Sequence, residues 1–240
     1  MPSPNRNSRI RPFEAAIRTA NRLRVQPELL LVCTFLLPTA IALAGEKPQV
    51  SVPPFDDKYS TLVRKLESGR TDIDYKEFRE SFLQSKQFQV AASKGSDLHR
   101  LRAALPELMA QSKYPEIVQT TKKMLSIDYT NMRAHKVLQQ TYKILKDEAN
   151  RQKYHDIEFG LLNSIIKNGD GKSCKTAWPV VQIEEEYFIL EMMDAELTRQ
   201  SIDDKGGLCD KMEVSTDKGK AIYYFGIVKV FEGRKRLGMK

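Results

Sequence analysis

The sequence predicts an α+β protein in which an N-terminal helical array is followed by a small antiparallel β-sheet. Up to Asn168, apolar residues recur with the three-and-four spacing of helix faces. After Gly171 they fall in short runs rich in β-branched and aromatic residues, which is typical of strands. Between the two, Asn168-Gly169-Asp170-Gly171 combines residues that end helices and form tight turns. We therefore expect a helical region at 58–168 and a β-rich region at 169–233 packed on the helices.

Residues 1–44 have the pattern of a secretory signal peptide. A basic region precedes the uncharged run at 29–44, which ends in the small-x-small sequence Ala42-Leu43-Ala44. Cleavage after Ala44 would give a periplasmic or secreted protein with no stable membrane span. An uncleaved anchor is the main alternative, although the run is shorter than the about 20 residues of a span and contains Pro38.

Two further alternatives concern the same segment. A lipoprotein would need a small residue before its cysteine, and Val32 precedes Cys33. The long basic region also allows a start codon downstream of Met1.

The charge of the chain does not indicate a nucleic-acid partner. The sequence has 39 basic and 31 acidic residues, of which six and two lie in 1–44, so the rest carries 33 and 29, a net charge of about +4. No nucleic-acid-binding motif is present, and the tail at 234–240 fits a solvated basic end. No cofactor is expected: Gly171-Lys172-Ser173 lacks the first glycine of a phosphate-binding loop.

Once Cys33 is removed with the leader, Cys174 and Cys209 remain. An even number of cysteines in an oxidising compartment favours a disulfide between them. Two separate thiols are the alternative. The two cysteines lack the neighbouring histidine pair of a zinc site, so no metal is expected.

The helical region begins after an extended linker at 45–57, which contains three prolines. A first helix presents Tyr59, Leu62, Val63 and Leu66 on one face and ends at Gly69. A second begins at Asp74, which stands in capping-box spacing with Glu77. Residues 92–97 are expected to form a loop, and Pro106 should kink or split the helix at 98–111.

The clearest helical periodicity runs from Tyr114 to Ile165, with turns at 126–131 and 147–150. The segment KYPEIVQTTKKMLSIDYTN resembles the second helix and inter-repeat turn of a tetratricopeptide repeat, and MRAHKVLQQTYKILKDEAN the helix that follows. Repeat geometry implies a basic groove, which would hold an acidic peptide or a C-terminal carboxylate. A solvated helix face is the alternative. The candidate binding residues are Arg133, Lys136, Gln140, Lys143, His99 and Arg102.

In the β-rich region, residues 177–183 suit a short strand beside Pro179. Glu184-Glu185-Glu186 fits a helix N-terminus, although a strand is also possible. Further strands are expected at 196–202 and 211–216. The strongest strand is expected at 221–231, after a hairpin turn at 217–220.

A loose set of polar residues surrounds the junction between the two regions: His135, His155, Asp170, Lys172, Ser173, Glu185 and Tyr187. A histidine beside a carboxylate can act as acid and base. The weak catalytic candidates are therefore His135, His155, Asp170 and Glu185. More commonly such histidines are satisfied core residues and such acids cap turns and helices.

Four strings together resemble the exported bacterial proteins grouped as domain of unknown function 4919: DYKEFRESFLQSKQF at 74–88, AH at 134–135, GLLNSIIKNGDGKSCKTAWPVV at 160–181 and EEEY at 184–187. The likeness covers most of 58–230. It implies a bacterial envelope or secreted protein and brings no activity or catalytic residues. The leading hypothesis is a protein- or peptide-binding module of the cell envelope. The alternatives are a hydrolase or small-ligand enzyme with its site at the junction, and a structural envelope component.

Overall fold

The structure is a computed structural model that describes residues 49–239. The predicted signal peptide at 1–44 lies outside the described residues. Within the described range the helical region contains seven helices: α2 Lys58–Glu67, α3 Tyr75–Gln84, α4 Lys86–Ser93, α5 Gly95–Ala110, α6 Tyr114–Ile127, α7 Met132–Ile144 and α8 Glu148–Ile166. None of the helices between 49 and 239 is both long and apolar enough to cross a bilayer.

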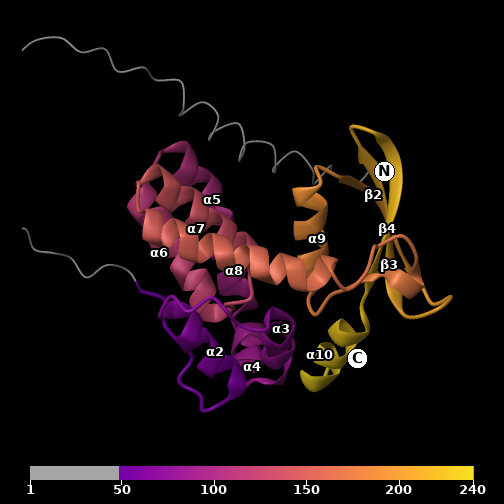
Figure 1. The fold of residues 1–240 in the computed structure, drawn as a ribbon, viewed down its shortest axis with the longest axis horizontal. Helices are drawn as coiled ribbons and strands as arrows, with labels where there is room; N and C mark the ends of the chain where they lie inside the picture. Colours follow the sequence, from indigo (N-terminus) through magenta and orange to yellow (C-terminus); the bar gives the residue numbers. More distant parts are fainter. Residues whose placement is uncertain (1–48, 240) are drawn as a thin grey trace, which may run out of the picture.

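A mixed sheet with two further helices follows, so the predicted α+β architecture is confirmed. The elements are η2 Cys174–Thr176, β1 Trp178–Pro179, α9 Ile183–Met192, β2 Glu196–Asp203, β3 Cys209–Thr216, β4 Gly219–Gly226 and α10 Val228–Arg236. The strand order is β1-β4-β3-β2. Strands β2, β3 and β4 form an antiparallel meander, whereas β1 pairs with β4 in parallel. Figure 1 shows α9 between the helical region and the sheet.

The periodic apolar positions form the helical core, as predicted. Ile117, Val118, Met124 and Leu125 of α6 are buried, and so are Leu138 and Tyr142 of α7. Each of α2, α3 and α7 begins at a side-chain cap, and Asp74 accepts a hydrogen bond from the Glu77 amide at 2.9 Å. The tetratricopeptide likeness of this array remains a prediction.

Four local predictions were wrong. Residues 92–97 are not a loop, because α4 reaches Ser93 and α5 begins at Gly95. The split predicted at Pro106 is absent, since α5 is one helix from Gly95 to Ala110, and only the alternative of a kink stays a prediction. The strand expected at 177–183 is only Trp178–Pro179, and its parallel pairing makes the sheet mixed. The long strand expected at 221–231 ends at Gly226, and α10 begins at Val228.

Tertiary packing explains the last difference. Ile227 is buried, and its amide donates to the carbonyl oxygen of Leu208 at 3.1 Å, which ends the ladder. Thereafter Val230 and Gly233 are buried at helical spacing. A Cβ on Gly233 would lie 3.2 Å from side-chain atoms of Leu83 and Phe88, so α10 packs closely on α3 and α4 (Figure 1). The β-branched composition of the segment alone favours a strand.

The junction at 168–171 forms the predicted helix stop and turn. Gly171 has a φ of +65°, and a Cβ there would meet the Trp178 ring at 2.7 Å, so both the backbone and the space require glycine. The Trp178 indole N–H donates to the carbonyl oxygen of Gly169 at 3.2 Å, and the Tyr224 amide donates to that of Gly171 at 2.9 Å. These bonds attach the turn to β1 and β4.

The predicted disulfide is present in the structure. Cys174 and Cys209 are bonded across 35 residues of sequence with their Cα atoms 5.7 Å apart. The bond fastens the segment before β1 to the start of β3.

Candidate functional site

A pocket of about 230 Å³ lies where α5, the turn between α6 and α7, and the start of α9 meet. Two lining residues, Arg102 and Arg133, belong to the predicted basic groove, and two others, Glu185 and Tyr187, to the junction set. The structure therefore brings parts of both predicted sites together. Sequence reasoning missed the other lining residues: Asp128, Thr130, Asn131, Met132, Gln182, Ile183, Glu184 and Phe188.

Two helix N-termini meet at this pocket. The Asn131 side chain caps α7 by accepting from the Ala134 amide at 3.0 Å. Gln182 precedes α9, and its side-chain amide donates to the Thr130 hydroxyl at 2.8 Å, which joins the two helix starts. Because the first amides of a helix have no intrahelical acceptor, both ends carry partial positive charge.

Asp128 is the buried acid of the pocket, with 5% of its surface exposed. Its Oδ1 accepts from the Thr130 amide at 2.9 Å and from the Thr130 hydroxyl at 2.6 Å. Burial and, to a lesser extent, the nearby charge of Glu184 raise the pKa of Asp128 to about 6, against the lowering effect of these hydrogen bonds. The carboxyl is therefore partly protonated under mildly acidic conditions.

The two arginines differ in their pairing. Arg133 forms an ion pair with Glu191 of α9. Arg102 makes no ion pair with any residue that the structure describes, and its Nε is buried without a hydrogen-bond partner there. A buried N–H without an acceptor is unfavourable, so Arg102 is the cation of this pocket that lacks a partner among the described residues.

The other predicted groove residues lie outside the pocket. Lys136 is covered by α9: its Nζ lies 3.2 Å from the Met192 sulfur and 3.9 Å from Glu191. The charge of Lys136 also acts on Glu158 of α8, and burial raises the pKa of that glutamate to about 7.

Three further groove residues are spread along α5 and α7. Gln140 has a buried side-chain oxygen without a partner in the described structure, while Lys143 and His99 are exposed. Because α9 packs on α7, the face that repeat geometry would leave open is partly covered.

The two histidines of the junction set have different surroundings. His135 is fully buried, and its Nε2–H donates to the carbonyl oxygen of Tyr129 at 2.7 Å. Burial lowers the pKa of His135 to about 3, so the ring stays neutral. His155 is partly exposed, stacks on Phe159 and lies 3.5 Å from the Gln139 side chain.

The two acids of that set have structural partners. Asp170 accepts from the Lys172 amide at 3.0 Å and the Thr176 hydroxyl at 2.6 Å, and the Thr176 bond in particular lowers its pKa. Glu185 accepts from the Val181 amide at 2.8 Å and pairs with Arg79.

The rest of the set is also dispersed. Ser173 hydrogen-bonds Thr176, and the Tyr187 hydroxyl donates to Gln200 at 2.9 Å. Within the described structure, no hydrogen bond or ion pair joins any two of the four catalytic candidates. Among residues 49–239, no three His, Cys, Asp or Glu side chains gather in a way that would hold a metal ion.

Comparison with known proteins gives one result. A family model described as Domain of unknown function (DUF4919) matches residues 55–236, which include every residue that lines the pocket. No curated protein and no solved structure matches the chain.

Proposed function

Since the chain belongs to the DUF4919 family, whose description assigns no activity, we infer its function from the pocket: we propose a binding module of the bacterial envelope that holds the C-terminal carboxylate of a peptide. Arg102 carries this proposal. It is the lining cation without an ion-pair partner among the described residues, and its buried Nε has no acceptor. A carboxylate can accept two parallel hydrogen bonds from a guanidinium group.

The two helix starts support the same ligand. Helix α7 has 13 residues and helix α9 has 10, and the N-termini of both lie at the pocket. Amides at a helix N-terminus favour a negatively charged group. The amides at these two helix starts would therefore add to the attraction that Arg102 offers a carboxylate.

The acids of the pocket limit how much negative charge the ligand can carry. Asp128, Glu184 and Glu185 line it beside two arginines, and one of those, Arg133, is already paired with Glu191. A polyanion would meet like charges, which disfavours nucleic acid and favours a single carboxylate.

The remaining walls are apolar and the space is small. Met132, Ile183 and Phe188 provide apolar contact surface. The volume of about 230 Å³ is below the roughly 300–1,000 Å³ of pockets for drug-sized ligands. This size fits a terminal apolar residue of a peptide rather than a long segment.

A peptide titration tests the proposal. Short peptides with apolar C-terminal residues would be titrated by calorimetry, each as the free acid and as the C-terminal amide. We expect binding of the acid and little binding of the amide. Arg102→Met should weaken binding about 10–150-fold, because a charge-assisted hydrogen bond contributes about 1.5–3 kcal/mol.

The matched control is Arg100→Met. Arg100 lies on the same helix, is exposed and pairs with Asp97, and it does not line the pocket. Equal binding of acid and amide, or equal losses in the two variants, would rule out carboxylate recognition by Arg102.

A further inference from the structure

The C-terminal helix α10 has one packed face and one open apolar face. Val230 and Gly233 are buried against the helical region, and Arg236 donates to the carbonyl oxygen of Leu83 at 3.1 Å. On the open side, Val228 is 51% and Phe231 41% exposed, and Met239 just beyond the helix is 52% exposed. Helix α10 is thus held in place while it presents large apolar side chains to solvent.

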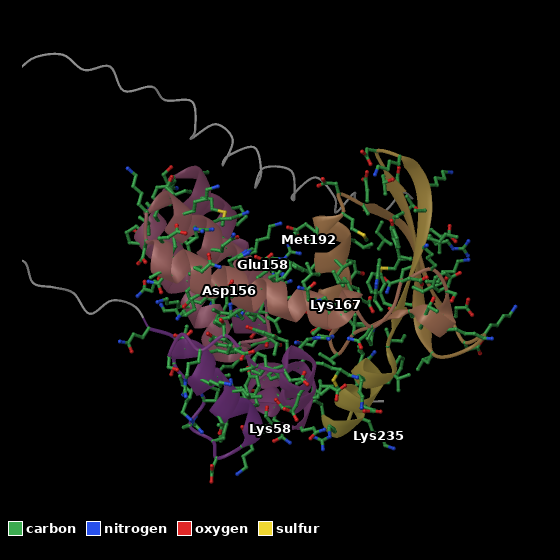
Figure 2. The ribbon with its side chains drawn as sticks, in the orientation of Figure 1. Lys58, Asp156, Glu158, Lys167, Met192 and Lys235 are labelled. Atoms are coloured by element: carbon green, nitrogen blue, oxygen red, sulfur yellow. A yellow bond between two sulfur atoms is a disulfide. The ribbon has the colours of Figure 1, made fainter. Side chains whose placement is uncertain are left out.

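These side chains line a second cavity, of about 460 Å³. Its apolar lining residues are Leu208, Val228, Phe231 and Met239, and its charged ones are Glu232, Arg234 and Lys235. The Arg234 guanidinium lies 5.9 Å from the centre of the Phe231 ring. Figure 2 shows Lys235 at the periphery of the molecule, on the side where the chain ends.

The charge around this surface is strongly positive. Residues 228–239 contain four Lys or Arg and one acid, Glu232, a net charge of +3. Glu232 pairs with Lys229 at 3.0 Å, whereas Lys235 has no ion pair with any described residue. An isologous contact with a second copy would bring these cations together, so this surface suits an anionic occupant rather than itself.

We propose that this α10 surface docks the protein on an anionic phospholipid membrane. Val228, Phe231 and Met239 enter the interface between headgroups and acyl chains, while Arg234 and Lys235 contact lipid phosphates. A short helix with apolar side chains on one face and Lys or Arg beside them is the pattern of interfacial binding. Each cation near an anionic surface adds about 1 kcal/mol of attraction. The proposal involves residues separate from the α5/α7/α9 pocket and does not depend on its ligand.

The experiment measures vesicle binding and hydrogen exchange on the full-length protein, produced with its own leader. Mass spectrometry would first establish that wild type and variants have the same N-terminus. Vesicles of mixed phosphatidylglycerol and phosphatidylcholine would be compared with vesicles of phosphatidylcholine alone. We expect amide exchange in α10 to slow severalfold with the mixed vesicles only. Exchange reports α10 directly, whatever the N-terminal segment does.

Two exposed substitutions and two matched controls make the test specific. Phe231→Ser and Lys235→Glu should each remove most of the α10 protection and lower the partition coefficient about tenfold. The controls are Ile202→Ser, at an edge-strand residue that is 60% exposed, and Lys218→Glu, in the turn at the opposite end of β4 from α10. The proposal fails if α10 gains no protection from exchange with anionic vesicles. It also fails if the control variants lose as much vesicle binding as Phe231→Ser and Lys235→Glu. A third contradicting result is protection of α10 that rises with protein concentration in the absence of lipid, which would identify a second copy of the chain as the partner of this surface.

Discussion

Arg79 of α3 binds Glu185 of α9 through two parallel hydrogen bonds, Nε to Oε1 at 2.7 Å and Nη2 to Oε2 at 2.6 Å. Both side chains are buried, and Arg79 also donates to Ser164 of α8 and to the carbonyl oxygen of Pro179 in β1. One guanidinium group therefore joins the helical region to β1 and to the start of α9. This contact fixes α9, whose first residues line the candidate pocket.

Arg79→Met should destabilise the protein by about 3–5 kcal/mol, because it leaves the Glu185 carboxylate buried without its partner. Chemical denaturation measures the loss. The double variant Arg79→Met with Glu185→Leu should regain much of it, since no charge then stays buried.

Arg100→Met serves as the control for this pair. Its ion pair with Asp97 is exposed, and a change of no more than about 0.5 kcal/mol is expected. A loss below about 1 kcal/mol in Arg79→Met would show that the buried pair does not hold the two regions together.

His135 should make the fold labile in acid. Its folded pKa of about 3 lies below the ordinary value of 6.5, so the unfolded chain takes up the proton first as the pH falls. The stability it contributes is complete above pH 6.5 and is lost towards pH 3. Between pH 7 and 4, wild type should lose about 3 kcal/mol more than His135→Gln. Urea titrations at each pH measure this difference.

His155→Gln is the matched control, because His155 is partly exposed. It should keep the pH dependence of wild type. Equal slopes for wild type and His135→Gln would contradict a neutral, buried His135.

Glu186 should make the folded protein less stable as the pH rises, the opposite of the effect of His135. Its side chain is completely buried on the sheet-facing side of α9, and burial together with Asp210 raises its pKa to about 9. The folded state therefore keeps the proton that the unfolded chain releases near pH 4.5, and stability falls between these values as the pH rises.

Glu186→Gln removes this titration while nearly preserving the shape of the side chain. Wild type should lose about 2–4 kcal/mol more than the variant between pH 5 and 8, measured by urea denaturation. Glu232→Gln, at an exposed position, should behave as wild type. Parallel curves for wild type and Glu186→Gln would mean that the Glu186 carboxyl ionises in the folded protein at ordinary pH.

The disulfide should contribute substantially to stability. It closes a loop across 35 residues, which corresponds to about 3–4 kcal/mol in the chain-entropy model. The double variant Cys174→Ser with Cys209→Ser should be less stable than wild type by this free energy. It should therefore unfold at a lower denaturant concentration. A reductant should lower the wild-type midpoint towards that of the variant and leave the variant unchanged. A wild-type midpoint that does not respond to reductant would show that the bond is not formed in solution.

Several features were predictable because they depend on local chemistry. The cap at Asp74, the stop at Gly69 and the turn at 168–171 follow from side-chain oxygens and glycines at fixed offsets. The strand β3 follows from alternation along the chain. The disulfide follows from two cysteines in a chain that carries an export pattern. The same local chemistry gave the wrong prediction for the α10 segment. Its β-branched residues favour a strand, whereas packing against α3 and α4 favours a helix.

By itself, the sequence determined where the helical region gives way to strands and which apolar faces are buried, and it favoured a disulfide between Cys174 and Cys209 over two separate thiols. Periodicity, capping and turn residues encode these features within a few neighbouring positions. Only the tertiary structure decided that Arg102, Asp128 and Glu184 meet at one pocket and that Glu185 is neutralised by Arg79, 106 residues away. Such meetings depend on how α3, α5 and α9 pack across long sequence separations, and no local pattern specifies that packing.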